Sequence, residues 1–263
     1  MISSTPSYTR RVVRIIAVAN QKGGVSKTTT THTLGVALAR LGERVLLVDL
    51  DPQGCLTFSL GLDPESLELS LHDVLIGKAT APDVLVTLDD VSLLPTNIDL
   101  AGAEMHLLTR TGREHTLARA LAPLHDDFDT VLIDCAPTLG VLTVNGLTAA
   151  REVIIPLQCE ALSHRGVAQL LDTINDVREF TNPHLHVRGA IATMFDARTR
   201  HAREVVDDVR ERFGITVLDP PVPKSIRFAE APSQGRTILD HAPNSPGAVA
   251  YQQLAAVLHA DAR

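Results

Sequence analysis

Lys22-Gly23-Gly24-Val25-Ser26-Lys27-Thr28-Thr29 is the most informative segment of this chain. It follows the apolar run Ile15-Ile16-Ala17-Val18-Ala19 and precedes a helical pattern over 28–41. A strand, a glycine-rich turn and a helix start form the context that a phosphate-binding loop requires. Small residues let backbone N–H groups close around phosphate oxygens, and the helix N-terminus adds unpaired donors and the positive end of its dipole. The segment therefore predicts a nucleotide-binding loop.

The side chains of this loop indicate ATP and Mg²⁺ as its ligands. Lys27 can reach the β- and γ-phosphates, and the hydroxyl of Thr28 can bind Mg²⁺. The predicted nucleotide-binding residues of the loop are Lys22, Gly23, Gly24, Val25, Ser26, Lys27, Thr28 and Thr29.

The loop departs from the general pattern G-x-x-x-x-G-K-[ST], because Gln21 and Ser26 occupy the two glycine positions. It fits a deviant form, K-G-G-x-G-K-[ST], except that Ser26 replaces a glycine. If this position needs a positive φ, serine introduces strain, whereas at negative φ it is harmless. The sequence leaves both alternatives open, and the rate of hydrolysis depends on them more than nucleotide binding does.

Two further apolar runs end in carboxylates. Residues 44–48 lead to Asp49 and Asp51, and residues 129–133 lead to Asp134. Continuous apolar runs of this length are typical of buried parallel strands, whose C-terminal ends carry the ligand sites of open α/β sheets. A carboxylate at position 134 can hold Mg²⁺, which bridges the terminal phosphates of a nucleotide.

With these motifs in this order, the chain resembles the ParA/MinD family of partition and positioning ATPases, and most closely its chromosomal ParA/Soj branch. The resemblance runs from about Arg14 to about Val257, and three later segments support it: 193–199, 225–233 and 241–248. The family's usual Pro-Arg-Asn is Pro223-Lys224-Ser225 in this chain.

The resemblance implies that ATP is bound between two subunits. Lys22 would reach the partner's phosphates, and Gly23 would lie where the two backbones approach closely. Asp51 would orient the attacking water and contribute to the metal site of Thr28 and Asp134, with Asp49 as a supporting group. Lys22, Lys27 and Asp51 are thus the expected catalytic residues. Adenine is expected near Pro223 and Ser225, with Met194 close by.

The resemblance also implies non-specific DNA binding by the ATP dimer, a ParB-like partner that stimulates slow hydrolysis, and a cytoplasmic, nucleoid-associated protein. The matching basic residues are Arg198, Arg227 and Lys224, with Arg200 and Arg203 as weaker candidates. The chain has a net charge of −7, yet residues 188–236 carry nine Lys and Arg against seven Asp and Glu. A locally basic region on an acidic protein favours a conditional attraction to phosphate.

The order of apolar runs predicts an α/β fold with a mostly parallel twisted sheet and helices on both faces, in the manner of phosphate-loop NTPases. Strands are expected over 14–19, 44–49, 91–95, 129–134, 152–157, 187–194 and 215–218. Helices are expected over 28–41, 98–109, 113–125, 163–180, 200–213 and 246–260. Residues 52–82 are the least regular and are expected to contain a short helical insertion.

Residues 1–13 form a basic tail that includes Arg10 and Arg11, and 14–263 are expected to form one domain. No apolar run approaches the roughly 18 residues that a membrane span needs, so no membrane contact is expected. Cys55, Cys135 and Cys159 form no C-x-x-C pair, which argues against disulfides and an iron–sulfur cluster.

Three other functions remain as alternatives to a ParA-type partition ATPase. A MinD-like membrane-cycling ATPase would need a basic amphipathic C-terminal helix, whereas 251–263 carry one Arg and one Asp. A ParA-like protein could have lost hydrolysis through Ser26. A biosynthetic ATP-dependent ligase or amidase-type synthase would need a second substrate pocket, for which the sequence offers no constellation.

Overall fold

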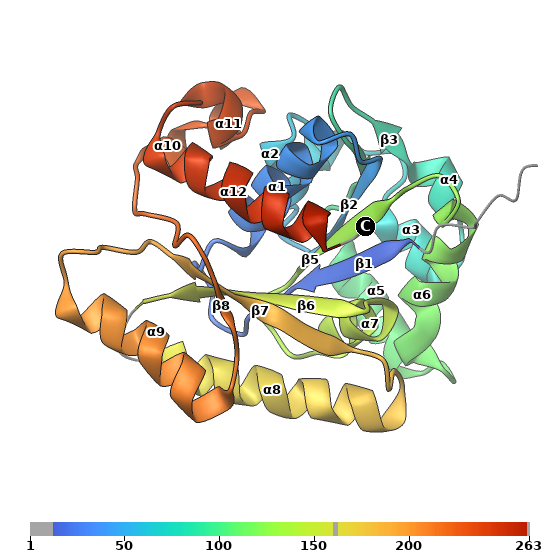
Figure 1. Cartoon of the computed structure of the whole chain (residues 1–263). Helices are drawn as coiled ribbons and strands as arrows, with labels where there is room; N and C mark the ends of the chain where they lie inside the picture. Colours follow the sequence, from blue (N-terminus) through green and yellow to red (C-terminus); the bar gives the residue numbers. More distant parts are fainter. Residues whose placement is uncertain (1–12, 160–162, 262–263) are drawn as a thin grey trace, which may run out of the picture.

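In the part of the chain that the structure describes, eight strands form one twisted sheet through the centre of the molecule (Figure 1). The computed structural model describes residues 13–159 and 163–261, so residues 1–12 of the predicted tail, with Arg10 and Arg11, lie outside the described residues. The strand order is β3-β4-β2-β5-β1-β6-β7-β8, and every neighbouring pair is parallel except β3 with β4. The prediction of a mostly parallel α/β sheet is confirmed.

The strands form where long apolar runs can be buried on both faces. Their bounds are β1 Arg14–Val18, β2 Val45–Leu50, β3 Val86–Thr87, β4 Ser92–Leu94, β5 Thr130–Cys135, β6 Glu152–Gln158, β7 His186–Thr193 and β8 Val217–Leu218. Seven of these match predicted strands within about two residues. The two-residue edge strand β3 was not predicted, because so short a segment carries no detectable periodicity.

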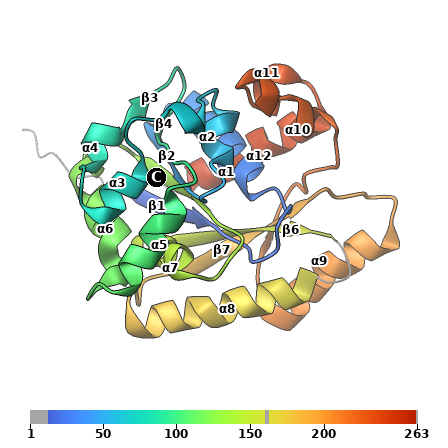
Figure 2. The same ribbon diagram turned by 180° about the vertical axis from the view of Figure 1, so that it is seen from behind.

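Helices cover both faces of the sheet (Figures 1 and 2). One face carries α1 Lys27–Arg40, α2 Cys55–Ser59, α10 Arg227–Glu230, α11 Ile238–His241 and α12 Pro246–Ala260. The other carries α3 Leu71–Ile76, α4 Ala81–Val84, α5 Leu100–Leu108, α6 Thr116–Leu121, α7 Val141–Ala149, α8 Ser163–Phe180 and α9 Arg200–Phe213. Successive residues of a strand point to opposite faces, so Leu46 and Val48 pack under the second group and Leu47 under the first.

Helix α7 was not predicted, although the long helices α1, α8, α9 and α12 were. Its sequence, VLTVNGLTA, contains four β-branched residues and a glycine, all of which disfavour a helix intrinsically. Packing overrides this preference, because Leu142 and Leu147 are buried in the core. The predicted insertion in 52–82 is present as α2, α3, the start of α4 and the 3₁₀ turn Pro64–Ser66.

Strand order brings the three predicted motifs together. β1 lies between β5 and β6, and β5 lies between β1 and β2. The register places Asp134 of β5 beside Val18 of β1 and beside Asp49 of β2. The phosphate-binding loop that follows β1 therefore opens next to both carboxylate-bearing strand ends.

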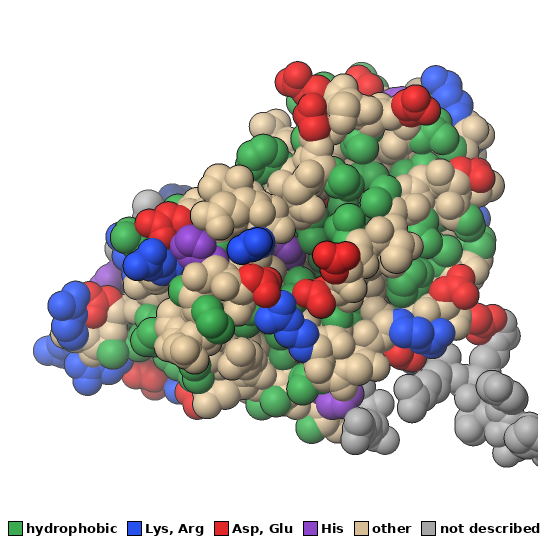
Figure 3. Space-filling view, turned by 90° about the horizontal axis from the view of Figure 1, so that it is seen from above, with side chains coloured by type: hydrophobic (Ala, Val, Ile, Leu, Met, Phe, Trp, Pro, Cys, Tyr) green, Lys and Arg blue, Asp and Glu red, His purple; other side chains and the backbone are tan. Residues whose placement is uncertain are grey.

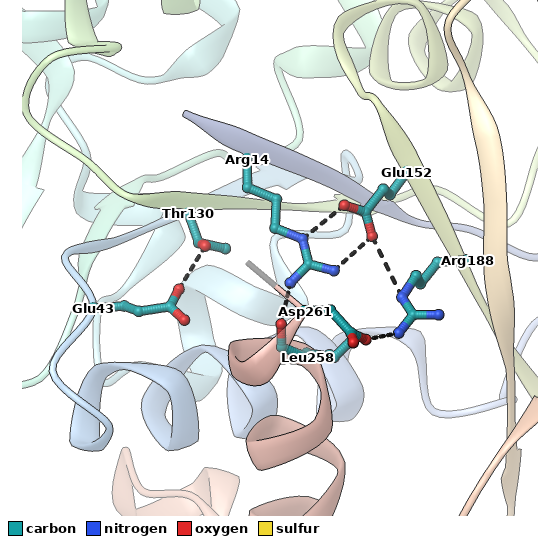
Figure 4. A network of polar contacts seen from close by, with 7 residues as sticks. All are labelled: Arg14, Glu43, Thr130, Glu152, Arg188, Leu258 and Asp261. Carbon is teal, nitrogen blue, oxygen red and sulfur yellow. Dashed lines mark hydrogen bonds and ion pairs between the residues drawn. The ribbon is translucent and has the colours of Figure 1, made fainter. Parts of the chain in front are cut away.

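A polar network near the N-terminal ends of three strands, opposite the phosphate-binding loop, holds the end of α12 in place (Figure 4). Arg14 donates two hydrogen bonds to Glu152, at 2.7 and 2.6 Å, and a third to the carbonyl of Leu258 at 2.6 Å. Arg188 pairs with the same Glu152 and with Asp261. Strands β1, β6 and β7 are thus joined to the helix that packs along α1.

Candidate functional site

The loop between β1 and α1 combines two left-handed residues with one buried anchor. Gly24 has a φ of 74°, and Ser26 has φ 69° and ψ 32°. Between them, Val25 is buried, and its carbonyl accepts a hydrogen bond from the hydroxyl of Thr193 at 3.1 Å. Position 26 therefore needs a positive φ, and of the two alternatives left open by the sequence the strained one holds. The cost of such a conformation for a residue with a Cβ is about 1–2 kcal/mol.

Lys27 is almost completely buried at the start of α1. Its ammonium donates to the carbonyl of Lys22 at 3.2 Å, which ties the two ends of the loop together. Burial lowers the pKa of Lys27, although the carboxylates of Asp134 and Asp51 act in the opposite direction. An anionic ligand at the loop would compensate for this desolvation.

The side chain of Lys22 reaches the C-terminal end of β6. Its ammonium donates to Gln158 Oε1 at 3.1 Å, and its backbone N–H donates to Asn20 Oδ1 at 3.0 Å. Asn20 in turn donates to the carbonyl of Pro156 at 2.7 Å, so the loop is attached to the neighbouring strand. The reach of Lys22 across to a partner subunit stays a prediction.

Thr28 and Asp134 form the structural link between the loop and β5. The Thr28 hydroxyl donates to Asp134 Oδ2 at 2.6 Å, and the Thr31 hydroxyl lies 3.4 Å from Oδ1. Asp134 is fully buried, and desolvation, reinforced by the nearby charge of Asp49, raises its pKa to about 8. A hydroxyl and a carboxylate are hard oxygen ligands of the type that Mg²⁺ prefers, so this pair fits the ion.

The two acids after β2 have different environments. Asp49 is fully buried and accepts hydrogen bonds from the N–H and hydroxyl of Thr57 at 2.8 and 2.7 Å, while burial raises its pKa to about 7. Asp51 is half-buried and lines the open cleft above the loop. Asp49 thus holds β2 against α2, and Asp51 is the acid that a bound ligand can meet.

The cleft has a volume of about 1120 Å³, which suits a nucleotide-sized ligand. Its floor is Gly23, Gly24, Ser26, Lys27, Thr28 and Thr29, and its walls include Asp51, Pro137, Met194, Phe58, Phe228 and Arg236. Sequence reasoning missed the two phenylalanines and Arg236, because single aromatic and basic residues far from the loop carry no motif.

Neither predicted adenine contact lines this cleft. Pro223 forms a bridge with Phe195 and borders a neighbouring depression of about 660 Å³. The hydroxyl of Ser225 accepts the backbone N–H of Arg227 at 3.3 Å. Met194, which was expected nearby, does line the cleft, with a positive φ of 50°. The adenine assignment stays a prediction.

The basic residues predicted to bind DNA are exposed, and two of them have carboxylate partners. Arg198 forms two 2.9 Å hydrogen bonds with Asp196, whose pKa these bonds lower to about 2. Arg227 pairs with Glu230 at 3.1 Å. Lys224 borders the same depression as Arg198. On the face shown in Figure 3, Lys and Arg side chains are likewise interspersed with Asp and Glu.

Metal clusters and membrane-spanning helices are both absent from the described residues. Within residues 13–159 and 163–261, no group of three or more His, Cys, Asp or Glu side chains could hold a metal ion. In the same residues no helix has both the length and the apolar character to cross a membrane. All three cysteines are free thiols.

Comparisons with known proteins agree with this geometry. A family model described as an AAA domain matches residues 13–187. The chain is 43% identical to the sporulation initiation inhibitor protein Soj of Bacillus subtilis, over 92% of this chain and 96% of Soj. It is also 43% identical to the chromosome partitioning protein ParA of Caulobacter vibrioides, over 92% of each.

A solved structure from Mycobacterium smegmatis is more similar in sequence. It is 55% identical, has a TM-score of 0.85 and covers 94% of each chain. That protein is described as cobyrinic acid a,c-diamide synthase and was solved with an ATP analogue and magnesium, and also with ADP and magnesium.

Proposed function

The chain belongs to the family of Soj- and ParA-type ATPases, and on this premise we propose that it segregates a chromosome or plasmid. In this proposal it hydrolyses ATP slowly with Mg²⁺, pairs on binding ATP and binds DNA without sequence specificity. A ParB-like partner stimulates hydrolysis and thereby release from DNA.

One observation carries the ATPase part of the proposal. Lys27, Thr28 and Asp134 lie together beneath the cleft, with Thr28 Oγ1 2.6 Å from Asp134 Oδ2. Bound Mg²⁺ supplies charge neutralisation at the terminal phosphates. Thr28 and Asp134 would hold that ion, Lys27 would contact the β- and γ-phosphates, and Asp51 would orient the attacking water from the wall of the cleft.

Gly23 supports pairing of two copies. A Cβ built on Gly23 meets no atom within 4 Å, and its φ is not positive. The fold of one subunit therefore gives no steric reason for glycine here, whereas close approach of a second backbone does. Lys22, next to it, would exchange its contact with Gln158 for the partner's phosphates, whose charge a single subunit neutralises incompletely.

DNA binding is assigned to Arg198, Arg227 and Lys224. Each subunit offers few phosphate contacts, and Asp196 and Glu230 neutralise part of the charge. Binding by one subunit should therefore be weak, and pairing should strengthen it by presenting two sets of contacts together.

The test is DNA binding with ADP, ATP and a slowly hydrolysed ATP analogue at several salt concentrations. Binding with ATP and the analogue, absence of binding with ADP, and a steep loss with salt are expected. Sedimentation under the same conditions should give a doubled mass only with the triphosphates. Equal DNA binding in all nucleotide states would refute the segregation cycle.

The similarity to the M. smegmatis protein favours a second candidate, an ATP-dependent amide-forming synthase acting on a corrinoid acid. The cleft extends from the loop toward Phe58, Phe228 and Arg236, which leaves room for a second substrate. Partial desolvation and nearby carboxylates raise the pKa of Cys55, and burial raises the pKa values of Cys135 and Cys159. A thiol that releases ammonia from an amide donor needs a lowered pKa, so these shifts argue against this candidate. ATP turnover that requires cobyrinic acid and ignores DNA would establish this candidate.

The remaining alternatives have distinct tests. Helix α12 buries Tyr251, Leu254 and Leu258 against the molecule, which is what a packing helix does rather than a membrane-binding one. ATP-dependent flotation with liposomes would nevertheless identify a MinD-like cycle. If the protein binds ATP and pairs but shows no turnover, and Ser26→Gly restores the turnover, then Ser26 impairs hydrolysis.

A further inference from the structure

Ser26 has a backbone conformation that favours glycine. Its φ of 69° and ψ of 32° are left-handed, and in the described part of the chain only Met194 is also a non-glycine residue with positive φ. A Cβ in this conformation crowds the backbone, so the fold of the loop by itself would be better served by glycine. The stability of the loop therefore does not explain why a serine occupies this position.

The hydroxyl of Ser26 does not act as a helix cap. Ser26 is the N-cap of α1, yet its side chain accepts no backbone N–H. Ser70, Thr237 and Ser245 are N-caps with extended backbones, and each accepts a bond from its own helix. Ordinary caps gain their stabilisation through that bond, which the left-handed Ser26 lacks.

Neighbouring groups, rather than the Ser26 side chain, hold the loop in place. The Val25 carbonyl accepts from Thr193, and the Ser26 carbonyl accepts the N–H of Thr30 at 2.9 Å. The Ser26 side chain is half-buried and lines the cleft next to Lys27 and Thr28. Its hydroxyl thus borders the cleft without a hydrogen-bond partner among the described residues.

We infer that the Ser26 hydroxyl donates a hydrogen bond to the diphosphate of the bound nucleotide, in ADP and ATP alike. Residues of such a loop cradle the α- and β-phosphates, and a bond from a hydroxyl to a charged phosphate oxygen is short and strong. The contact adds a side-chain hydrogen-bond donor at a position where the glycine of the usual loop pattern offers only its backbone N–H. It deepens the proposed function, because tighter retention of ADP slows the return of the protein to its ATP form.

Two substitutions separate the hydroxyl from the backbone strain. Ser26→Ala keeps the Cβ and the strain but removes the hydroxyl, whereas Ser26→Gly removes both. Affinities for ADP and a slowly hydrolysed ATP analogue, and the rate of ADP release, are measured with a fluorescent nucleotide and no DNA. Both variants should bind both nucleotides about tenfold more weakly and release ADP correspondingly faster. In the nucleotide-free state, only Ser26→Gly should melt at a higher temperature.

Ser59→Ala is the matched control. Ser59 lines the same cleft, but its hydroxyl donates to the carbonyl of Leu56 at 2.9 Å and lies 3.1 Å from His32 Nδ1. This variant should lose stability and keep its nucleotide affinity. Unchanged affinity in Ser26→Ala, or a change confined to Ser26→Gly, would overturn the inference. ADP does not drive pairing in the proposed cycle and no DNA is present, so the ADP affinities and release rates remain informative if the segregation cycle fails.

Discussion

The hydroxyl of Thr28 donates to Asp134 Oδ2 at 2.6 Å, joining the first turn of α1 to the end of β5. This contact places a hydroxyl and a carboxylate side by side beneath the cleft, although 106 residues separate them in the sequence. Asp134 is buried with a raised pKa, so its charge destabilises the nucleotide-free fold. The buried charge of Asp134 therefore lowers the stability of the nucleotide-free protein, and the same charge is needed when Mg²⁺ is bound.

Asp134→Asn should separate these two effects. The pKa of Asp134 is about 8 in the folded protein and about 4 in the unfolded chain, so ionisation weakens the wild-type fold as pH rises between them. The variant should be more stable than wild type without nucleotide, increasingly so up to pH 8, yet bind Mg²⁺–ATP at least tenfold more weakly. Thermal melts from pH 5 to 9 and nucleotide titrations measure both; unchanged Mg²⁺–ATP affinity would remove Asp134 from the metal site.

Lys22→Ala should abolish ATP-driven pairing and retain part of the nucleotide affinity. The substitution removes a charge that would neutralise the partner's phosphates, while Lys27 stays in place. Lys78→Ala, at an exposed lysine outside the cleft, is the control and should pair normally. Light scattering with saturating ATP and Mg²⁺ gives the dimer fraction, and an unchanged fraction would contradict the role of Lys22 in trans.

Asp51→Ala should slow hydrolysis by roughly 100-fold or more, the usual effect of losing a group that positions or activates a nucleophile. ATP binding should persist, so the ATP dimer should accumulate and dissociate slowly. The control is Glu65→Ala, which removes another carboxylate from the same cleft. Phosphate release and sedimentation are measured together. Hydrolysis as fast as in the wild type would exclude Asp51 as the residue that orients water.

Arg198→Glu combined with Arg227→Glu should abolish retention on DNA and leave nucleotide affinity intact. The two ion pairs that are lost are exposed, so their loss should cost little stability. Arg44→Glu with Arg113→Glu makes the same change in net charge at two other arginines that also have carboxylate partners. Filter binding at several salt concentrations compares the DNA retention of the two double variants. If both lose DNA retention equally, the effect comes from net charge and not from a specific DNA-binding site.

His32 should make the fold sensitive to acid. It is buried and lies 3.1 Å from the Ser59 hydroxyl, and burial lowers its pKa from 6.5 to about 4. The neutral ring is favoured in the folded state, so the contribution of His32 to stability is complete above pH 6.5. This contribution is lost as pH decreases toward 4, by roughly 3 kcal/mol in total. Urea unfolding across this range should show a shallower pH dependence in His32→Gln.

The control for this pH dependence is His184→Gln, because His184 is exposed. It should follow the wild-type curve. Parallel curves for the wild type and His32→Gln would show that His32 does not titrate between pH 6.5 and 4.

The sequence predicted the architecture because the apolar runs of the strands and the periodicity of the long helices are local properties. It did not predict α7, whose β-branched residues and Gly146 become helical only through burial of Leu142 and Leu147. It also missed the short elements around Phe228 and Arg236, whose positions above the cleft depend on packing between distant segments.

The sequence by itself determined the loop, its lysines, its threonine and the order of the carboxylates, since each belongs to a motif that spans a few residues. Only the tertiary structure decided that Ser26 is left-handed, that Asp49 supports α2 while Asp51 opens to the cleft, and that Lys22 contacts Gln158. Backbone dihedrals, burial and partners depend on how strands distant in sequence are placed side by side, and no local pattern records that placement.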